Sequence, residues 1–120
     1  MSFTSPSRKQ HNPKKDQEKK MIEMLVGLNV SNDEHYALYR KGMTPLLTAA
    51  GGGFGYDFKV SEVLINKSGN EINRVFTINF PSNEVMKTFF SNPEYLEIKA
   101  KFFEGSVLET TIISSYEKNE

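Results

Sequence analysis

The sequence of 120 residues predicts an α+β domain whose elements follow the order βαββαβ. Two observations in its second half indicate this order. A serine that can cap a helix and a proline that separates it from the next one predict two short helices after residue 80, and an apolar run from Val107 to Ser115 follows them. In the first half, a segment with a helix-capping motif and helically spaced apolar residues lies between an apolar run and a glycine-rich turn. A chain of this length buries a single hydrophobic core, so we expect one domain.

The first strand is predicted at residues 21–30. Its apolar run is too continuous for a strand with one solvent-exposed face, so we expect both of its faces to be covered. Ser31 and Glu34 then stand at the spacing of a capping box and predict the start of a helix. Pro45 lies within this helix and should bend or divide it one or two residues earlier. The helix is expected to bury an apolar stripe of Tyr36, Tyr39, Met43, Leu46, Leu47 and Ala50.

A glycine-rich segment at residues 51–55 is expected to stop the helix and to form a tight return. The segment 56–63 alternates in polarity for most of its length, as a strand does. A turn cluster at residues 66–70 then leads into a further apolar strand at 75–80. The two strands and the turn cluster between them together predict a β-hairpin.

Two helices and a strand are predicted after the hairpin. Ser82 is placed to cap the first helix. Pro93 disfavours helical geometry at Asn92 and so separates this helix from a second one. Gly105 should end the second helix, and the β-branched run 107–113 is predicted as the last strand. The second helix is expected to present one apolar face made of Tyr95, Ile98 and Phe102.

This order of elements is that of the ferredoxin-like fold, in which a four-stranded antiparallel sheet carries both helices on one face. The opposite face of such a sheet is bare. Here the strands have apolar residues on both faces, since Phe76 and Ile78 point to one side of the sheet and Val75 points to the other. We therefore expect the chain to pair with a copy of itself through the sheets.

Residues 1–20 differ in composition from the remainder of the chain. They carry six basic and two acidic side chains, whereas the other hundred residues carry nine basic and thirteen acidic ones. With two prolines and few apolar groups, this segment is expected to be a flexible basic extension, and the domain is expected to occupy residues 21–117. The acidic body offers no basic surface for a duplex, so we do not expect a nucleic-acid partner.

Residue counts exclude several kinds of chemistry. The chain has no cysteine, which excludes disulfides, thiolate metal sites and a cysteine nucleophile. Its two histidines, His11 and His35, cannot build the usual zinc site, and we expect neither a metal nor a cofactor. No apolar run reaches the roughly 18 residues of a membrane span, and no secretory signal is present, so a cytoplasmic protein is expected.

From Met21 to Tyr116 the chain resembles domain-of-unknown-function family 1330 of the dimeric α/β-barrel superfamily. The resemblance rests on the pair Gly51–Gly52 and on the segments 80–82 (Phe-Pro-Ser) and 91–95 (Ser-Asn-Pro-Glu-Tyr). It implies a short bacterial protein in which two ferredoxin-like subunits form one barrel from their sheets. Characterised relatives in the superfamily include cofactor-independent monooxygenases, lactone isomerases and haem-dependent enzymes, whereas this family has no settled activity.

The chain departs from the common pattern of that family after the glycine pair. Many relatives have an arginine there, whereas this chain continues with Gly53 and Phe54. A pocket built on that arginine therefore cannot be transferred to this sequence.

Several polar residues are candidates for a site near the interface of helices and sheet. His35 and Asp57 could form a general acid and base pair, although His35 also fits an exposed helical position. Arg40 and Arg74 could clamp a carboxylate or form ordinary ion pairs. The remaining candidates are Tyr36, Tyr39, Asn79 and Tyr95.

Two kinds of role are open for these remaining candidates. The three tyrosines could line an aromatic pocket or fill the core. Asn79 projects from the face of its strand opposite to Phe80, and we expect it to be the one deeply buried polar group, where its amide could bind a ligand or form a structural hydrogen bond.

The function predicted from these observations is binding of a small organic molecule by a homodimer, in a cleft between sheet and helices of each subunit. An alternative is a cofactor-independent isomerase or monooxygenase acting on a small aromatic compound or lactone. In it, Asp57 or His35 would move the proton, and Arg40 or Arg74 would orient the substrate. A second alternative is a dimeric interaction module that presents its basic extensions.

Overall fold

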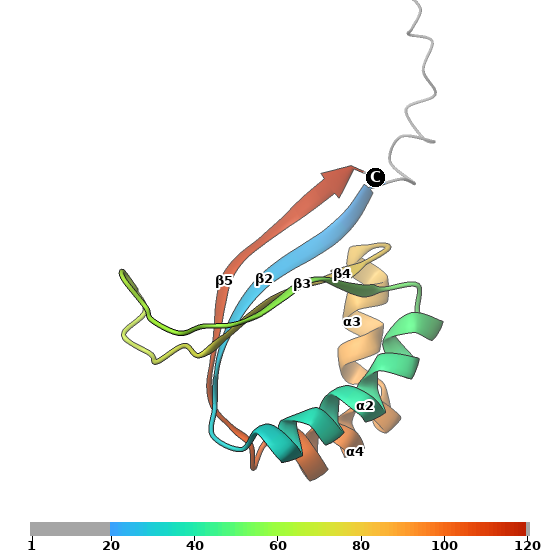
Figure 1. Cartoon of the computed structure of the whole chain (residues 1–120). Coiled ribbons are helices and arrows are strands. Elements are labelled where there is room, and N and C mark those ends of the chain that lie inside the picture. Colours follow the sequence, from blue (N-terminus) through green and yellow to red (C-terminus); the bar gives the residue numbers. More distant parts are fainter. Residues whose placement is uncertain (1–19, 120) are drawn as a thin grey trace, which may run out of the picture.

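The computed structural model describes residues 20–119 and confirms the predicted order of strands and helices (Figure 1). Its elements are β2 (Lys20–Val30), α2 (Asp33–Ala49), β3 (Gly53–Lys59), β4 (Arg74–Phe80), α3 (Asn83–Ser91), α4 (Pro93–Ile98), the π-helical turn η1 (Lys99–Phe103) and β5 (Val107–Asn119).

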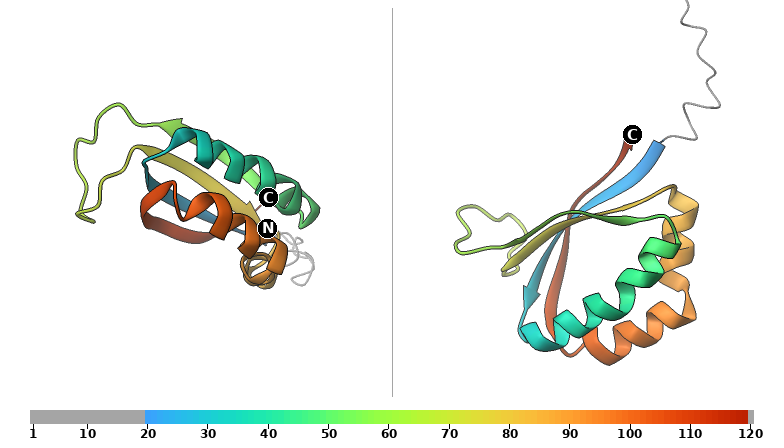
Figure 2. Two further views of the ribbon diagram at one scale, coloured as in Figure 1. Left: turned by 90° about the horizontal axis from the view of Figure 1, so that it is seen from below. Right: turned by 45° about the vertical axis from the view of Figure 1, so that its right-hand side comes forward.

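The four strands form one antiparallel sheet in the order β3-β4-β2-β5, which is the ferredoxin-like arrangement. All the helices lie on one side of this sheet, and both views of Figure 2 show the same layering. The outer strand β5 ends at Asn119, beyond the predicted end of the last strand, and pairs with β2 as far as Lys20. These two strands run on past the shorter β3 and β4 as a twisted ribbon (Figure 1).

The core lies between the helices and one face of the sheet, as expected for the ferredoxin-like fold. Alternate residues of β2 and β4, among them Leu28 and Phe80, point to the helices and are almost fully buried. On the helical side, Tyr36, Met43 and Leu47 of α2 pack against them. The apolar stripe predicted for this helix is therefore the stripe that it buries.

The predicted cap of α2 is wrong by one residue. Asn32, not Ser31, is the N-cap, because its side-chain Oδ1 accepts a hydrogen bond from the backbone N–H of His35 at 3.1 Å. Ser31 is instead held by the turn before β5. Its backbone N–H and its hydroxyl both donate to the carbonyl of Ser106, at 2.8 and 3.3 Å.

Pro45 does not divide α2, which runs without interruption from residue 33 to residue 49. A proline in a helix interior costs about 3 kcal/mol because it removes one hydrogen bond and crowds the preceding turn. Here Met43 before the proline and Leu47 after it are both fully buried. Packing of the two side chains anchors the helix on both sides of the proline, which explains why the helix continues.

The return after α2 is shorter than predicted, because Gly53 and Gly55 already belong to β3. Gly51 has a φ of +86°, the left-handed conformation that glycine adopts without strain. At Gly52 the strand β4 passes so closely that a Cβ would lie 2.5 Å from the carbonyl oxygen of Asn79. The first two glycines therefore make the turn, and the last two begin the strand.

A β-bulge in β3 sets the direction of its side chains. Phe54 pairs with Ile78 and Asp57 with Phe76, so Gly55 and Tyr56 together stand opposite the single residue Thr77. The Thr77 hydroxyl accepts the N–H of Tyr56 at 2.9 Å. Because of the extra residue, Phe54 and Asp57 both face the helices although they are three positions apart.

The hairpin of β3 and β4 is confirmed by their antiparallel pairing, but its first strand ends at Lys59 rather than at residue 63. Residues 60–73 form a long loop that projects from the end of the sheet (Figures 1 and 2). Leu64 and Ile65 in this loop are almost fully exposed.

The predicted pair of helices after β4 is confirmed. Ser82 caps α3 by accepting the N–H of Val85 at 3.1 Å. Asn92 ends α3 in an extended conformation and caps α4, which begins at Pro93. The chain therefore turns between the two helices at the residues that the sequence indicates.

None of the helices among residues 20–119 is both long and apolar enough to span a membrane. The basic extension predicted at the N-terminus falls, apart from Lys20 in β2, outside the described residues, as does His11.

Candidate functional site

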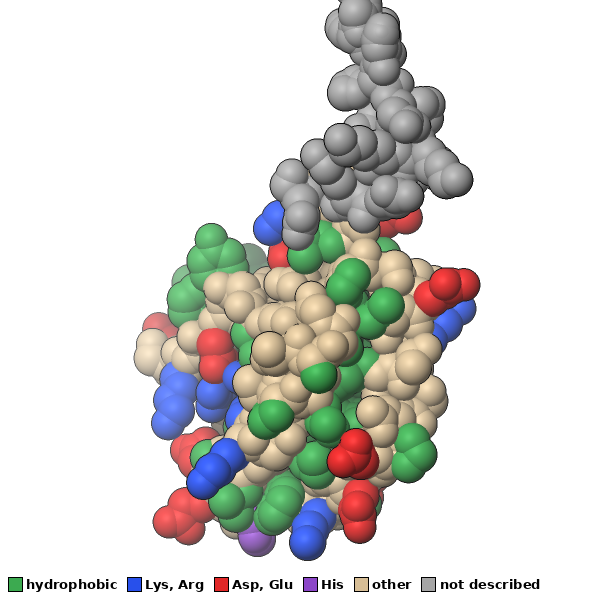
Figure 3. Space-filling view, turned by 90° about the vertical axis from the view of Figure 1, so that its right-hand side faces the viewer, with side chains coloured by type: hydrophobic (Ala, Val, Ile, Leu, Met, Phe, Trp, Pro, Cys, Tyr) green, Lys and Arg blue, Asp and Glu red, His purple; other side chains and the backbone are tan. Residues whose placement is uncertain are grey.

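A cavity of about 320 Å³ lies between the sheet and the helices. Most of its wall is apolar, and β2, β4 and the helices contribute to it. On the outside of the helical layer, apolar side chains run down the middle of the surface, and charged ones lie mostly toward its edges (Figure 3). Representative apolar residues of the wall are Val26, Met43, Phe76, Ile78, Phe90 and Phe103.

Two buried tyrosines supply the first polar feature of this wall. The hydroxyls of Tyr39 on α2 and Tyr95 on α4 lie 2.9 Å apart and share a hydrogen bond. Burial raises the pKa of both phenols above their usual value, and most strongly that of Tyr39. Both hydroxyls therefore stay protonated near neutral pH. Since one of the two hydrogens fills the shared bond, the other can be donated to a ligand.

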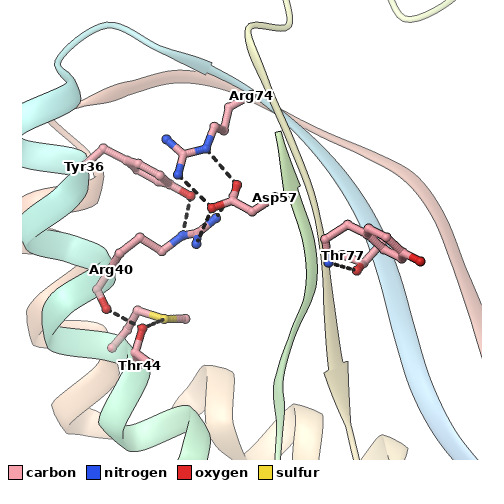
Figure 4. A network of polar contacts seen from close by, with 8 residues as sticks. Tyr36, Arg40, Thr44, Asp57, Arg74 and Thr77 are labelled. Carbon is pink, nitrogen blue, oxygen red and sulfur yellow. Dashed lines mark hydrogen bonds and ion pairs between the residues drawn. The ribbon is translucent and has the colours of Figure 1, made fainter. Parts of the chain in front are cut away.

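The second polar feature is an ion-pair network between α2 and the sheet (Figure 4). Arg74 of β4 binds both carboxylate oxygens of Asp57, with Nε–Oδ1 at 2.8 Å and Nη2–Oδ2 at 2.9 Å. Arg40 of α2 approaches the same carboxylate more loosely, at 3.2 and 3.4 Å, and its Nε donates to the hydroxyl of Tyr36 at 2.8 Å. The network thus joins two guanidinium groups to one carboxylate.

The arginines also fix the protonation state of the carboxyl group. The hydrogen bond from Arg74 and the charge of Arg40 lower the pKa of Asp57 below its usual value. The same hydrogen bond raises the pKa of Arg74. Burial raises the pKa of Tyr36, although Arg40 opposes this effect. Asp57 therefore stays ionised near neutral pH and is a weak base.

Arg40 is the member of this network that lines the cavity. Its guanidinium carbon lies 4.0 Å from the ring centroid of Phe54 and 4.8 Å from that of Phe76. The Tyr36 ring is the third aromatic face, at 5.2 Å. The Arg40 side chain is only 16% exposed. The three rings and its hydrogen bonds to Tyr36 and Asp57 hold it in position.

Six of the eight predicted site residues fall into two groups, and two residues lie outside both. Tyr39, Arg40 and Tyr95 line the cavity, and Tyr36, Asp57 and Arg74 are linked to it through Arg40. His35 and Asn79 belong to neither group.

His35 is not brought together with Asp57. It is exposed in the first turn of α2, where its Nδ1 lies 3.5 Å from the side-chain amide of Asn32, and its ring lies near Phe102. Asp57 instead has the two arginines as its partners.

Asn79 projects away from Phe80, as predicted, but this direction places it on the sheet face opposite to the cavity. There it is only half-buried, whereas Glu23 and Thr77 on the same face are buried polar residues. The expectation that Asn79 would be the deep polar group is wrong. Glu23 is deeper because Tyr116 and Lys118 of the long β5 strand cover its carboxylate, at 2.5 and 3.4 Å.

Two polar residues of the cavity wall were missed by the sequence analysis, Lys99 and Thr110. Lys99 follows Tyr95 by four positions, and this spacing could have placed it on the same helical face. Thr110 has the parity of Ile112 on β5, so strand alternation could have placed it beside the core.

The described part of the chain contains no group of three or more histidine, aspartate or glutamate side chains that could hold a metal ion. The cavity wall provides hydroxyl, guanidinium and ammonium groups. Such a wall is suited to donating hydrogen bonds to a ligand.

The family model described as "Domain of unknown function (DUF1330)" matches residues 24–116 of the chain. A comparison with curated proteins gave no match.

Among solved structures, a protein of unknown function from Rhodopseudomonas palustris is 19% identical, with a TM-score of 0.67, over 85% of this chain and 83% of that one. A hydroxynitrile lyase from Passiflora edulis is 15% identical, with a TM-score of 0.58, over 85% and 96%. A dabb family protein with a ferredoxin-like fold from Mesorhizobium loti is 11% identical, with a TM-score of 0.56, over 84% and 97%. At these identities the likeness shows the fold alone, and it agrees with the predicted fold class.

Proposed function

The chain belongs to the DUF1330 family, and we propose that it binds a small, mostly apolar organic molecule in the cavity between its sheet and its helices. The observation that carries this proposal is the make-up of the wall. A largely apolar lining with a few polar groups at fixed positions is typical of ligand pockets, and about 320 Å³ lies at the lower end of their usual range.

Binding fits the described groups better than proton transfer does. Tyr39 and Tyr95 keep their protons near neutral pH, and Asp57 is held ionised by two arginines. None of the three is tuned toward neutrality, where a general base works best. The wall can therefore orient and hold a ligand, but these groups are poor proton shuttles.

The second candidate is the cofactor-independent enzyme, and one observation favours it. The hydroxynitrile lyase from Passiflora edulis has the same fold, and hydrogen-bond donors such as those of this wall can stabilise an oxyanion. Exchange of carbon-bound hydrogen of a bound ligand for deuterium, followed by NMR in D2O, would support this reading if it slows in the Tyr39→Phe variant, which lacks one of these donors.

Ligand binding should depend on the hydroxyl of Tyr39. In a thermal-shift screen of small acids, lactones and phenols, a compound at a hundred times its Kd should stabilise the protein by about 2.7 kcal/mol. Tyr39→Phe removes one member of the hydroxyl pair and should weaken the best binder by about three- to tenfold in a titration.

Tyr56→Phe is the matched control, because Tyr56 is exposed and does not line the cavity. It should leave the affinity unchanged. Ile112→Trp should block binding, because Ile112 lines the cavity and a larger side chain there would occupy part of its volume. Ile112 is half exposed, so the protein can accommodate the indole ring without overpacking its core. If no compound stabilises the protein, or if Tyr56→Phe weakens binding as much as Tyr39→Phe, the proposal fails.

We further propose that two copies associate through the sheet face that carries no helices. Tyr56 and Phe58 are each more than half exposed and stack on one another, with ring centroids 5.9 Å apart. Phe58 pairs with Val75, and Ile113 on β5 is also exposed. An apolar surface of this kind on an otherwise ordinary soluble chain supports self-association.

A charge placed on this face should shift the chain toward the monomer. Phe58→Glu would bury a carboxylate in the proposed contact, so its sedimentation coefficient at micromolar concentration should fall relative to the wild type. Leu96→Glu is the control, because Leu96 is similarly exposed but lies on α4, on the other side of the molecule. A wild type that sediments as a monomer at every concentration would exclude the association.

The interaction module with basic extensions depends on residues 1–19, which lie outside the described structure. It stays a prediction.

A further inference from the structure

We propose that the ligand of this cavity carries a single anionic oxygen group, in the simplest case one carboxylate, on an apolar aryl or short alkyl body. This inference rests on the proposed function, because it names the chemical class of the bound molecule. Among the described residues, those that line the cavity include two cationic side chains, Arg40 and Lys99, and no aspartate or glutamate. The wall therefore has an excess of positive charge.

Asp57 does not cancel this excess. Its two oxygens are bound at 2.8 and 2.9 Å by Arg74, which does not line the cavity, and only at 3.2 and 3.4 Å by Arg40. Two guanidinium groups share one carboxylate, so the network keeps a net charge of +1. Arg40 is the member of the network that can present this charge to a ligand.

Arg40 also keeps hydrogen-bond donors for a ligand. A guanidinium group has five N–H donors, and three of them are used by Tyr36 and Asp57. The stacking of Phe54 and Phe76 against the group holds it in place. A carboxylate that accepts the remaining N–H donors would therefore bind to a group that is already positioned.

The other polar groups of the wall favour the same ligand class. The Tyr39–Tyr95 pair has one O–H hydrogen left to donate, and Lys99 donates but cannot accept. A negatively charged oxygen is a suitable acceptor for each of these donors, and its attraction to a cation is stronger in this mostly apolar cavity than in water. Apart from Thr110, the rest of the wall is apolar, so a charge on the ligand that faced it would lose its hydration without finding a partner.

Matched acids and amides test the charge directly. We would titrate phenylacetate, phenylacetamide, octanoate and octanamide into the full chain at pH 7, where each acid differs from its amide mainly by the negative charge. The wild type should bind each acid at least about tenfold more tightly than its amide. In Arg40→Met the acid should lose about tenfold in affinity and the amide less than about threefold.

Lys41→Met is the matched control, because Lys41 is the next residue of α2, is exposed and does not line the cavity. It should keep the preference for the acid. Lys99→Met is a second test that leaves the Asp57 network intact, and it should also reduce this preference. The inference is overturned if the amides bind as tightly as the acids, or if both Arg40→Met and Lys99→Met keep the full preference.

The outcomes also separate this inference from the proposed function. If amides bind, Ile112→Trp blocks them and acids gain nothing, the cavity is a binding site and only the charge assignment falls. If neither acids nor amides nor the neutral compounds of the screen bind, the proposed function fails and this inference fails with it.

Discussion

Replacing Leu47 by alanine should lower the free energy of unfolding by about 3–5 kcal/mol. Leu47 is 1% exposed and packs in the core between α2 and the sheet. One of its methyl carbons lies only 2.7 Å from where a Cβ of Gly52 would stand, so the turn after the helix is fitted to this side chain. Truncation leaves a cavity that the neighbouring strand and helix cannot easily fill, and the loss should appear in urea unfolding curves.

Leu38→Ala removes the same atoms from the same helix and is the control. Leu38 is 44% exposed, so its loss should cost less than about 1 kcal/mol. Equal losses at the two positions would mean that α2 does not bury the face described above.

Asp57→Asn should also destabilise the fold, by about 1–3 kcal/mol at pH 7, because it leaves charged groups without their partner. The substitution removes the negative charge that Arg40 and Arg74 share, and it leaves two largely covered guanidinium groups close together. About one third of the Asp57 side chain is exposed, which reduces the loss below that of a fully buried pair. Asp33→Asn is the control, because its 3.6 Å pair with Lys59 is well exposed and should contribute no more than about 0.5 kcal/mol.

The pH dependence of the Asp57 effect has a defined sign. The folded chain holds the pKa of Asp57 below the value of 3.8 for a free side chain. Its contribution to stability is therefore fully present above about pH 4 and is lost as the pH falls through the lower pKa of the folded state. The difference in unfolding free energy between the wild type and Asp57→Asn should shrink in acid. A difference that stays constant down to the lowest pH at which both fold would contradict the ion-pair role.

The elements of the fold could be predicted where their signals are local. Ser82 and Pro93 act within one or two turns, so their positions in the sequence were enough to place α3 and α4. The cap of α2 was predicted one residue too early because Ser31 and Asn32 are both good caps. The choice between them depends on the carbonyl of Ser106, which is 75 residues away from Ser31.

The candidate site was harder to predict because its geometry depends on tertiary contacts. The tyrosines and arginines could be named from the sequence, but nothing local indicates that Arg74 is occupied by Asp57 while Arg40 lines the cavity. The direction of Asp57 depends on the bulge in β3. Alternation counted from Tyr56 onward does not show that Phe54 and Asp57 share a face.

This bulge also makes β3 tolerant of a change in length at one place. Phe54 and Asp57 share a face because Gly55 and Tyr56 are accommodated opposite one residue. If either of those two residues were deleted, Phe54 and Asp57 would become next-but-one neighbours in a regular strand and would still face the same side. A deletion elsewhere in the strand would reverse one part of it relative to the other. An alignment of related chains should therefore allow a gap at these two positions before the charged residues of their cavities are compared.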